Sequence, residues 1–189
     1  MIELVKRRLA CENSRFKVYL NSIRASTGYE VSDYLVVAPK VVAKNLCTGV
    51  AVLPYYKGKI GLVHLYRYPV GEGVWEVPRG FLDADESPST SALRELEEET
   101  GVTCPQKYLL DLGTVMSEAG ILRGRTHLFA ALGCKRIREF PGEEIGHRDF
   151  HWFTGEEICE LLRNSSIEDA TKISAVYKLF LHQPSVVSC

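Results

Sequence analysis

Residues 80–102 read GFLDADESPSTSALRELEEETGV, and this stretch predicts a helix with well-defined ends. Ser87 can cap the helix and Pro88 can be its first residue, because proline lacks only an N–H that would have no partner there. Gly101 can end the helix about three and a half turns later, since glycine readily adopts the left-handed conformation found after a helix. The stretch therefore predicts a helix that ends just before Gly101.

Three glutamates on this predicted helix have the spacing of metal ligands. Glu95 lies three residues before Glu98 and four before Glu99, so the three carboxylates project from neighbouring positions on the helix. Clustered anions repel one another unless a cation lies among them, and carboxylate oxygens suit Mg²⁺ or Mn²⁺. Because Mg²⁺ usually keeps coordination positions open for water and phosphate, the pattern indicates a phosphate-bearing substrate.

Two nearby residues are placed to support the glutamates. Arg94 lies four residues before Glu98 and can orient its carboxylate, while Glu86 precedes the helix and can reach back to Arg94. The alternative interpretation is a plain solvated acidic face. Arg94 is the only base on the predicted helix against four glutamates, so such a face would repel itself, and this favours the metal site.

Length and composition limit the classes of protein that fit. A chain of 189 residues with 46% hydrophobic content suits one soluble domain with a small appendage. The net charge of −1 predicts no nucleic-acid partner, and no apolar run is long enough to predict a membrane span. The basic residues 6–8 precede Cys11 without the apolar stretch of a lipoprotein signal, so we expect a cytoplasmic protein.

Hydrophobic patterning predicts an α+β fold in which helices lie on both sides of a mixed β-sheet. We expect a small N-terminal β-sheet region within residues 1–45 and the main domain over residues 46–189. Strands are expected at residues 16–20, 34–37, 48–53, 60–66, 109–115, 126–132 and 149–153, an extended segment at 75–78, and helices at 158–162 and 169–182.

The stretch from Gly80 to Val102 resembles the Nudix box at every fixed position. Within that superfamily the chain is similar to the ADP-ribose and nucleotide-sugar pyrophosphatases. The motifs that carry this similarity are Leu65-Tyr66-Arg67, which resembles a Q-Y-R triplet, Glu76-Val77-Pro78-Arg79-Gly80, which fits E-x-P-x-G, and Ile167 to Lys172, which resembles a D-A-K-T stretch. The resemblance implies the Nudix fold and a homodimer assembled through residues 1–45.

The same resemblance implies hydrolysis of a nucleoside diphosphate linked to another group X, by water attacking the pyrophosphate. It implies metal ligation by Glu95, Glu98, Glu99 and the backbone carbonyl of Arg79. Mg²⁺ or Mn²⁺ would neutralise the pyrophosphate and lower the pKa of a bound water. Family members often add a carboxylate from a later loop, here residues 133–147. The candidates in this loop are Glu139, Glu143 and Glu144, of which Glu143 and Glu144 are favoured for catalysis and Glu144 also as a metal ligand; the alternative is a solvated loop charge.

Several residues near these motifs are candidates for holding the substrate. Arg67 and Arg79 suit phosphate because a guanidinium can bind two oxygens at once, and Arg123 and Arg125 flank the loop after the box. The alternative for these arginines is ordinary surface exposure. By resemblance Glu76 contacts the nucleoside. The aromatic residues Tyr66, Tyr68 and Trp75 can stack on a base or belong to the core.

Two departures from the group concern the choice of substrate. Ser117-Glu118-Ala119-Gly120 lacks the proline of an S-P-G-like loop, and Arg79 stands where the group usually has alanine. The resemblance favours ADP-ribose or a nucleotide sugar as the substrate, and the two departures leave alternatives open. The alternatives are a Nudix hydrolase of dinucleoside polyphosphates or nucleoside triphosphates, and a non-catalytic nucleotide-sensing module on the same fold.

Overall fold

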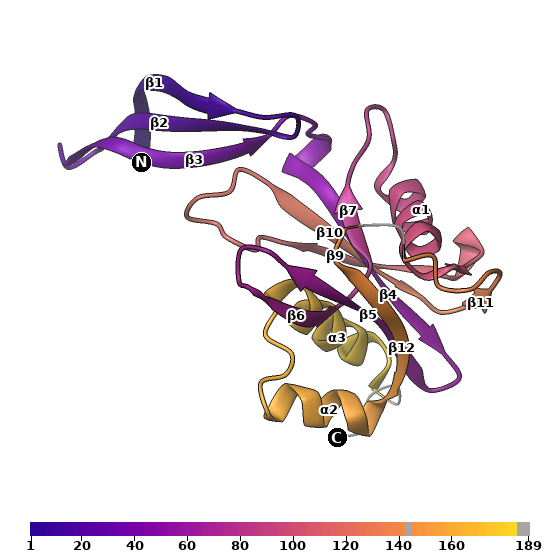
Figure 1. The fold of residues 1–189 in the computed structure, drawn as a ribbon. Helices are drawn as coiled ribbons and strands as arrows, with labels where there is room; N and C mark the ends of the chain where they lie inside the picture. Colours follow the sequence, from indigo (N-terminus) through magenta and orange to yellow (C-terminus); the bar gives the residue numbers. More distant parts are fainter. Residues whose placement is uncertain (143–144, 185–189) are drawn as a thin grey trace.

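The central strand of the molecule, β4 (Cys47–Tyr56), is buried on both faces. Figure 1 shows β4 within the main sheet. In this computed structural model, which describes residues 1–142 and 145–184, every residue from Cys47 to Pro54 is buried. Successive side chains of a strand point to opposite faces. Val50 and Val52 accordingly pack in one core cluster, and Leu53 belongs to another on the opposite face.

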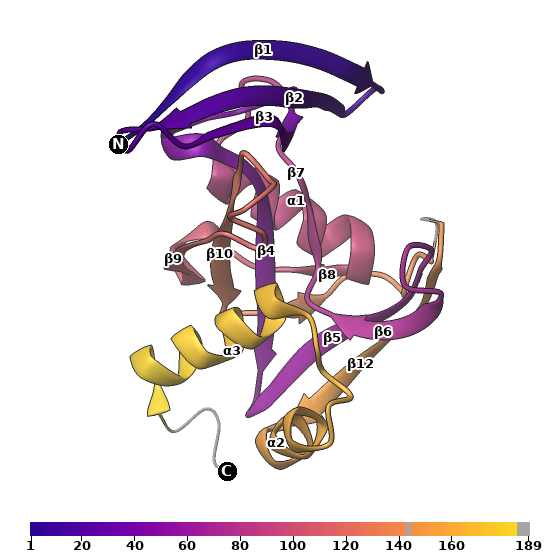
Figure 2. The ribbon, with the colours of Figure 1, turned by 90° about the vertical axis from the view of Figure 1, so that its left-hand side faces the viewer.

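Each face of β4 is covered by a different helix. α1 (Pro88–Thr100) packs against the Val50 face through Leu96, and α3 (Ala170–His182) packs against the other face through Leu179. Figure 2 shows α1 and α3 on opposite sides of β4. α2 (Gly155–Arg163) follows β12 (His147–Thr154) and packs against β12 and β5 (Lys59–Arg67). The predicted arrangement of helices on both sides of a sheet is confirmed.

The main sheet has seven strands and contains both parallel and antiparallel pairs. β10 runs parallel to β4, whereas the other pairings are antiparallel, which confirms the predicted mixed sheet. Besides β4, the sheet contains β5 (Lys59–Arg67), β6 (Glu72–Glu76), β7 (Arg79–Phe81), β9 (Leu109–Val115), β10 (Arg125–Ala131) and β12 (His147–Thr154). The short elements are 3-10 helices at Lys44–Leu46 and Gln106–Tyr108 and a strand pair of β8 (Val102–Thr103) with β11 (Lys135–Arg136).

The helix ends follow the predicted capping residues. The Ser87 hydroxyl accepts a hydrogen bond from the Thr90 N–H at 3.1 Å, and Gly101 ends α1 with a φ of 69°. Thr154 forms a capping box with Glu157 at the start of α2. These local signals place the box helix at Pro88–Thr100, as predicted.

The N-terminal region forms a separate three-stranded antiparallel sheet rather than the two short strands that we expected. It comprises β1 (Ile2–Glu12), β2 (Phe16–Ala25) and β3 (Glu30–Pro39). β1 escaped prediction because all of its residues are exposed, so no apolar alternation marks it. The sheet lies at one end of the molecule, bridged to the main domain at Val37 and Leu122. Within residues 1–142 and 145–184, no helix is long and apolar enough to cross a membrane.

Replacement of Leu96 by alanine is expected to loosen α1 from the sheet. The Leu96 side chain is fully buried against β4, so Leu96→Ala should lower the free energy of unfolding by about 2–5 kcal/mol. Leu181→Ala on the exposed side of α3 is the matched control and should change it by less than about 0.5 kcal/mol. Denaturant unfolding measures both, and equal losses would contradict the docking role of Leu96.

Candidate active site

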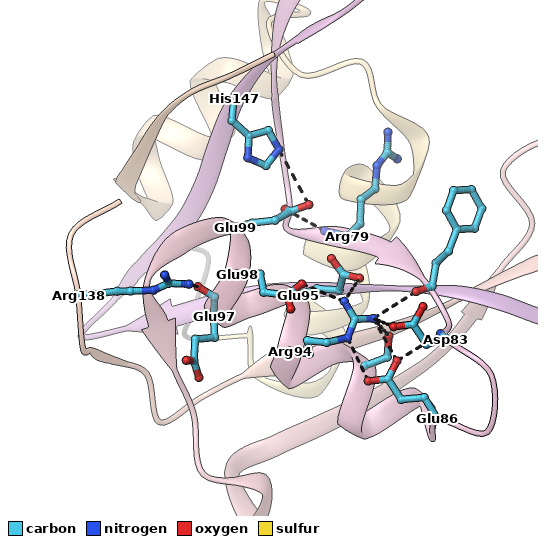
Figure 3. A network of polar contacts seen from close by, with 12 residues as sticks. Arg79, Asp83, Glu86, Arg94, Glu95, Glu97, Glu98, Glu99, Arg138 and His147 are labelled. Atoms are coloured by element: carbon cyan, nitrogen blue, oxygen red, sulfur yellow. Dashed lines mark hydrogen bonds and ion pairs between the residues drawn. The ribbon is translucent and has the colours of Figure 1, made fainter. Parts of the chain in front are cut away.

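The box helix places two of its three candidate metal ligands in the interior. Glu95 and Glu99 are only 5% and 4% exposed, whereas Glu98 is exposed. The Glu95 carboxylate lies against the backbone of β7. The closeness of this contact is shown by Gly80, where a Cβ would lie 2.1 Å from Glu95 Oε1. A side chain at position 80 would therefore fill the space that this carboxylate occupies. Figure 3 shows the three carboxylates along one side of α1.

Arg94 connects the glutamates around it. Its Nη1 lies 2.7 Å from Glu95 Oε1 and 3.0 Å from Glu98 Oε2, and its Nε and Nη2 donate to the Glu86 carboxylate at 3.1 and 3.0 Å (Figure 3). The hydrogen bonds to Glu86 are the main reason that the pKa of Arg94 is raised, and the same contact lowers the pKa of Glu86. The contacts expected of Arg94 with Glu86 and Glu98 are present.

The backbone of Arg79 faces Glu99. Pro78 and Leu82 make backbone hydrogen bonds to β4, and alternate residues of a strand point their backbone groups in opposite directions. The N–H and C=O of Arg79 therefore point away from β4, and the N–H donates to Glu99 Oε2 at 3.2 Å. The Arg79 carbonyl consequently lies on the edge of β7 that faces Glu99.

The donor set of this edge suits a hard divalent cation. In the described part of the chain, no three acidic, histidine or cysteine side chains are already gathered at metal-binding distance, and Arg94 lies among the glutamates instead. The carboxylates of Glu95, Glu98 and Glu99 and the Arg79 carbonyl offer oxygen ligands only, which is the chemistry that Mg²⁺ and Mn²⁺ prefer. The residues present therefore fit the predicted ion.

A third buried carboxylate, Glu76, lies between two arginines. Glu76 is 2% exposed and accepts hydrogen bonds from Arg67 Nε at 3.0 Å and Nη2 at 2.6 Å, while Arg79 Nη2 lies 2.6 Å from its Oε2. The pKa of Arg67 is raised, chiefly by the hydrogen bonds to Glu76, with smaller contributions from the charges of Glu99 and Asp169. Arg67 thus lies within electrostatic reach of both the box helix and α3.

Asp169, which caps α3, and Lys172 within α3 lie beside this ion-pair network, although we assigned them no role from the sequence. Asp169 caps α3 through the Lys172 N–H and accepts a 2.9 Å hydrogen bond from Arg79 Nη1. The Lys172 ammonium donates to the carbonyl of Trp75, and the side chain is 1% exposed. The available signal was Lys172 itself, a basic residue on the apolar face of the predicted helix.

His147 is a further neighbour of the glutamates that the sequence did not single out. Its Nε2 lies 4.0 Å from Glu99 Oε1, and its side chain is 4% exposed (Figure 3). β12 brings it there by pairing His147 with Leu65 at the far end of β5. Pairing between segments so distant in sequence leaves no local signal.

The remaining candidates lie apart from the glutamates or outside the described residues. Arg123 and Arg125 line a separate cavity of about 310 Å³ that Arg7 of the N-terminal sheet also lines. Glu139 is exposed and lies 3.6 Å from Arg136. Glu143 and Glu144 lie outside the described residues, so their predicted roles stay predictions.

Two cavities share Arg67 and Arg79 as lining residues. One of about 280 Å³ reaches Gly80 and lies between the main sheet and Phe16 of the N-terminal sheet. The other, of about 640 Å³, extends past Trp75 towards the segment between α2 and α3. The two arginines therefore stand at a junction between the edge that carries the glutamates and a larger cavity.

Comparison with known families matches residues 46–174 to the NUDIX domain. The chain belongs to the Nudix family. A methanol dehydrogenase activator from Bacillus methanolicus is 33% identical over 129 residues, which cover 67% of this chain and 68% of that protein. An ADP-ribose pyrophosphatase from Bacillus subtilis (strain 168) is 28% identical over 169 residues, which cover 88% of this chain and 85% of that protein.

The comparison with solved structures gives the same fold. A crystal structure of an ADP compounds hydrolase superposes with a TM-score of 0.79 at 16% identity, covering 97% of this chain and 94% of that chain. The predicted Nudix fold and the predicted enzyme class, a Nudix pyrophosphohydrolase, are thereby confirmed. Nudix hydrolases generally use divalent metal ions, in agreement with the oxygen donors beside Glu99.

Because the Lys172 ammonium is buried, the free energy of unfolding of this Nudix enzyme should rise with pH in the alkaline range. Burial lowers the pKa of Lys172 to about 8, below its value near 10.4 in an unfolded chain. Between these values the unfolded chain binds more protons, so stability rises with pH. The free energy of unfolding of wild type, relative to Lys172→Met, should rise by up to about 3 kcal/mol between pH 7 and 10.5.

Denaturant unfolding across this pH range measures that difference. Lys178→Met is the matched control, since Lys178 also donates to a backbone carbonyl from α3 but is only partly buried. A wild-type advantage that changes equally with pH against both variants would refute the assignment to Lys172.

Proposed function

We propose that this Nudix enzyme hydrolyses the pyrophosphate bond of a nucleoside diphosphate linked to a sugar, most readily ADP-ribose or an ADP-sugar, with Mg²⁺ or Mn²⁺. The products are a nucleoside monophosphate and a sugar phosphate. The observation that carries the proposal is the pair of buried carboxylates, Glu95 and Glu99, against the β7 backbone beside Arg67 and Arg79. The name of the Bacillus subtilis relative supports ADP-ribose.

In the proposed reaction, one set of residues binds the metal ion and another binds the phosphate groups. Glu95, Glu98, Glu99 and the Arg79 carbonyl would hold the divalent ion, which when bound neutralises the pyrophosphate and acidifies a water. Arg94 keeps the carboxylates of Glu95 and Glu98 oriented, and Glu86 fixes Arg94 in turn. Metal ligands that are already held in place need not rearrange during the reaction, and this lowers the barrier to hydrolysis.

In this scheme, Arg67 and Arg79 bind the phosphate groups of the substrate. Glu76 holds both guanidinium groups at the junction of the two cavities, so their remaining N–H groups are presented in a fixed orientation. Guanidinium groups match phosphate oxygens geometrically, and the fixed orientation reduces the entropy lost on binding. Glu76 therefore serves the substrate through the two arginines.

Removal of one charge from Glu99 is expected to abolish most activity. Glu99→Gln should lower kcat with ADP-ribose at least about 100-fold, because the amide is a weaker metal ligand and cannot accept a proton. Glu97→Gln is the matched control: it removes the same charge from the same helix at an exposed position (Figure 3). Release of AMP in the presence of Mg²⁺ measures both variants.

The same assay separates the candidate substrates. A panel of ADP-ribose, ADP-glucose, GDP-mannose, diadenosine polyphosphates and ATP is incubated with the wild-type enzyme, and the released nucleotides are quantified. Fastest turnover of the ADP-sugars supports the proposal. Preference for diadenosine polyphosphates or ATP supports the alternative Nudix hydrolase, and turnover of none would support a nucleotide-sensing module.

The comparison of the two variants tests the metal site. Equal losses of kcat in Glu97→Gln and Glu99→Gln would mean that Glu99 is not a metal ligand.

We also propose that residues 1–45 form a dimerisation element beside a Nudix hydrolase domain over residues 46–189. β1 is an edge strand with every residue exposed, and Leu4 and Leu9 are 51% and 49% exposed. Exposed strand edges with apolar side chains favour pairing with another chain.

The oligomeric state tests this proposal. Light scattering should give twice the chain mass for wild type and the single-chain mass for a Leu4→Asp, Leu9→Asp variant. Leu181→Asp, an equally exposed change on α3, should remain dimeric. A monomeric wild type, or a dimer that survives both substitutions in β1, would contradict a dimer held through this strand.

A further inference from the structure

The larger of the two cavities extends the proposed pyrophosphate site in one direction. It has a volume of about 640 Å³, within the range of small-molecule pockets, and begins at Arg67 and Arg79. From there it passes between β6 and the segment that joins α2 to α3, which Figure 2 shows running beside β5 and β6. A group attached to a phosphate held by these arginines can enter it directly.

The charge of this cavity disfavours additional phosphate groups. Its two guanidinium groups already contact carboxylates, and acidic side chains outnumber them. A third or fourth phosphate placed there would meet net negative charge. The charged side chains that line the cavity are Arg67, Arg79, Glu72, Glu76, Glu168 and Asp169.

The same walls suit a group that carries several hydroxyls. Ionised carboxylates accept hydrogen bonds only, so they pair with hydroxyl donors. Asp169 is fixed for this role, because its two oxygens accept from the Lys172 N–H at 2.8 Å and from Arg79 at 2.9 Å and still have lone pairs left. Ser166 and Glu168 are exposed along the same wall and supply further polar groups.

Another part of the lining is aromatic and held rigidly. The Trp75 ring contacts His64 at 4.8 Å and Phe153 edge-on at 4.9 Å between ring centroids. Gly73 leaves room for the His64 ring, since a Cβ at Gly73 would lie 2.8 Å from His64 Nε2. A flat indole that lines the cavity beside hydroxyl acceptors is a surface on which the C–H face of a sugar ring can stack.

We propose that this cavity, between Trp75 and the wall formed by Ser166, Glu168 and Asp169, is the subsite for an uncharged, polyhydroxylated group X of the substrate. The proposal rests on the proposed pyrophosphatase function and specifies where the sugar half binds. It assigns Ser166 and Glu168, which line this cavity, to substrate specificity.

Two substrates that differ only in X test the subsite. ADP-ribose is compared with an ADP ester in which a methyl group replaces the sugar, and kcat/KM is measured for each. In Glu168→Gln, which weakens a charged hydrogen bond, and in Ser166→Trp, which fills the cavity, the ratio of ADP-ribose to methyl ester should fall about ten-fold. Glu160→Gln, an exposed change on α2 outside the cavity, should keep the wild-type ratio.

The outcomes separate the subsite from the function. A wild-type enzyme that cleaves neither compound overturns the proposed function itself. A wild-type enzyme that cleaves both, with ratios unchanged in Glu168→Gln and Ser166→Trp, overturns only the sugar subsite. If Ser166→Trp impairs diadenosine diphosphate but not ADP-ribose, the cavity holds a nucleobase and the sugar assignment is wrong. Thermal unfolding of each variant confirms that it is folded.

Discussion

The arrangement of the site depends on how three buried carboxylates are compensated. Glu76, Glu95 and Glu99 are each at most 5% exposed, and a buried carboxylate without partners would be strongly destabilising. Glu76 receives two guanidinium groups, Glu95 contacts Arg94, and Glu99 accepts the Arg79 N–H. These partners come from β5, β7 and α1, so satisfying the charges also fixes how the strands and the helix meet.

Arg79 contributes to this arrangement through both its backbone and its side chain. The backbone N–H contacts Glu99 of α1, while the guanidinium contacts Glu76 of β6 and Asp169 at the start of α3. Alanine, which the resembled group usually has at this position, could make only the backbone contact. The departure that complicates the substrate assignment from sequence is thus the residue that couples the metal edge to the larger cavity.

Local patterns were sufficient to predict much of the fold and half of the site. The capped helix with Glu95 and Glu99, the β4–β5 hairpin and the contacts of Arg94 all involve residues near one another in sequence. The missed features depend on long-range pairing or lack a burial pattern. His147 reaches Glu99 through β12, and β1 is exposed throughout. Such features follow from tertiary structure, which periodicity and capping signals do not encode.

The two ends of the site differ in the number of guanidinium groups that face their carboxylates, and this difference supports the proposed position of the cation. Around Glu76, two guanidinium groups face one buried carboxylate, with Asp169 as a further acceptor. Around Arg94, one guanidinium is shared among four carboxylates, those of Asp83, Glu86, Glu95 and Glu98. The group around Arg94 therefore carries excess negative charge, which a bound divalent cation would offset. This excess of negative charge supports the proposal that the cation binds along α1, with Arg67 and Arg79 holding the phosphate and the group attached to it.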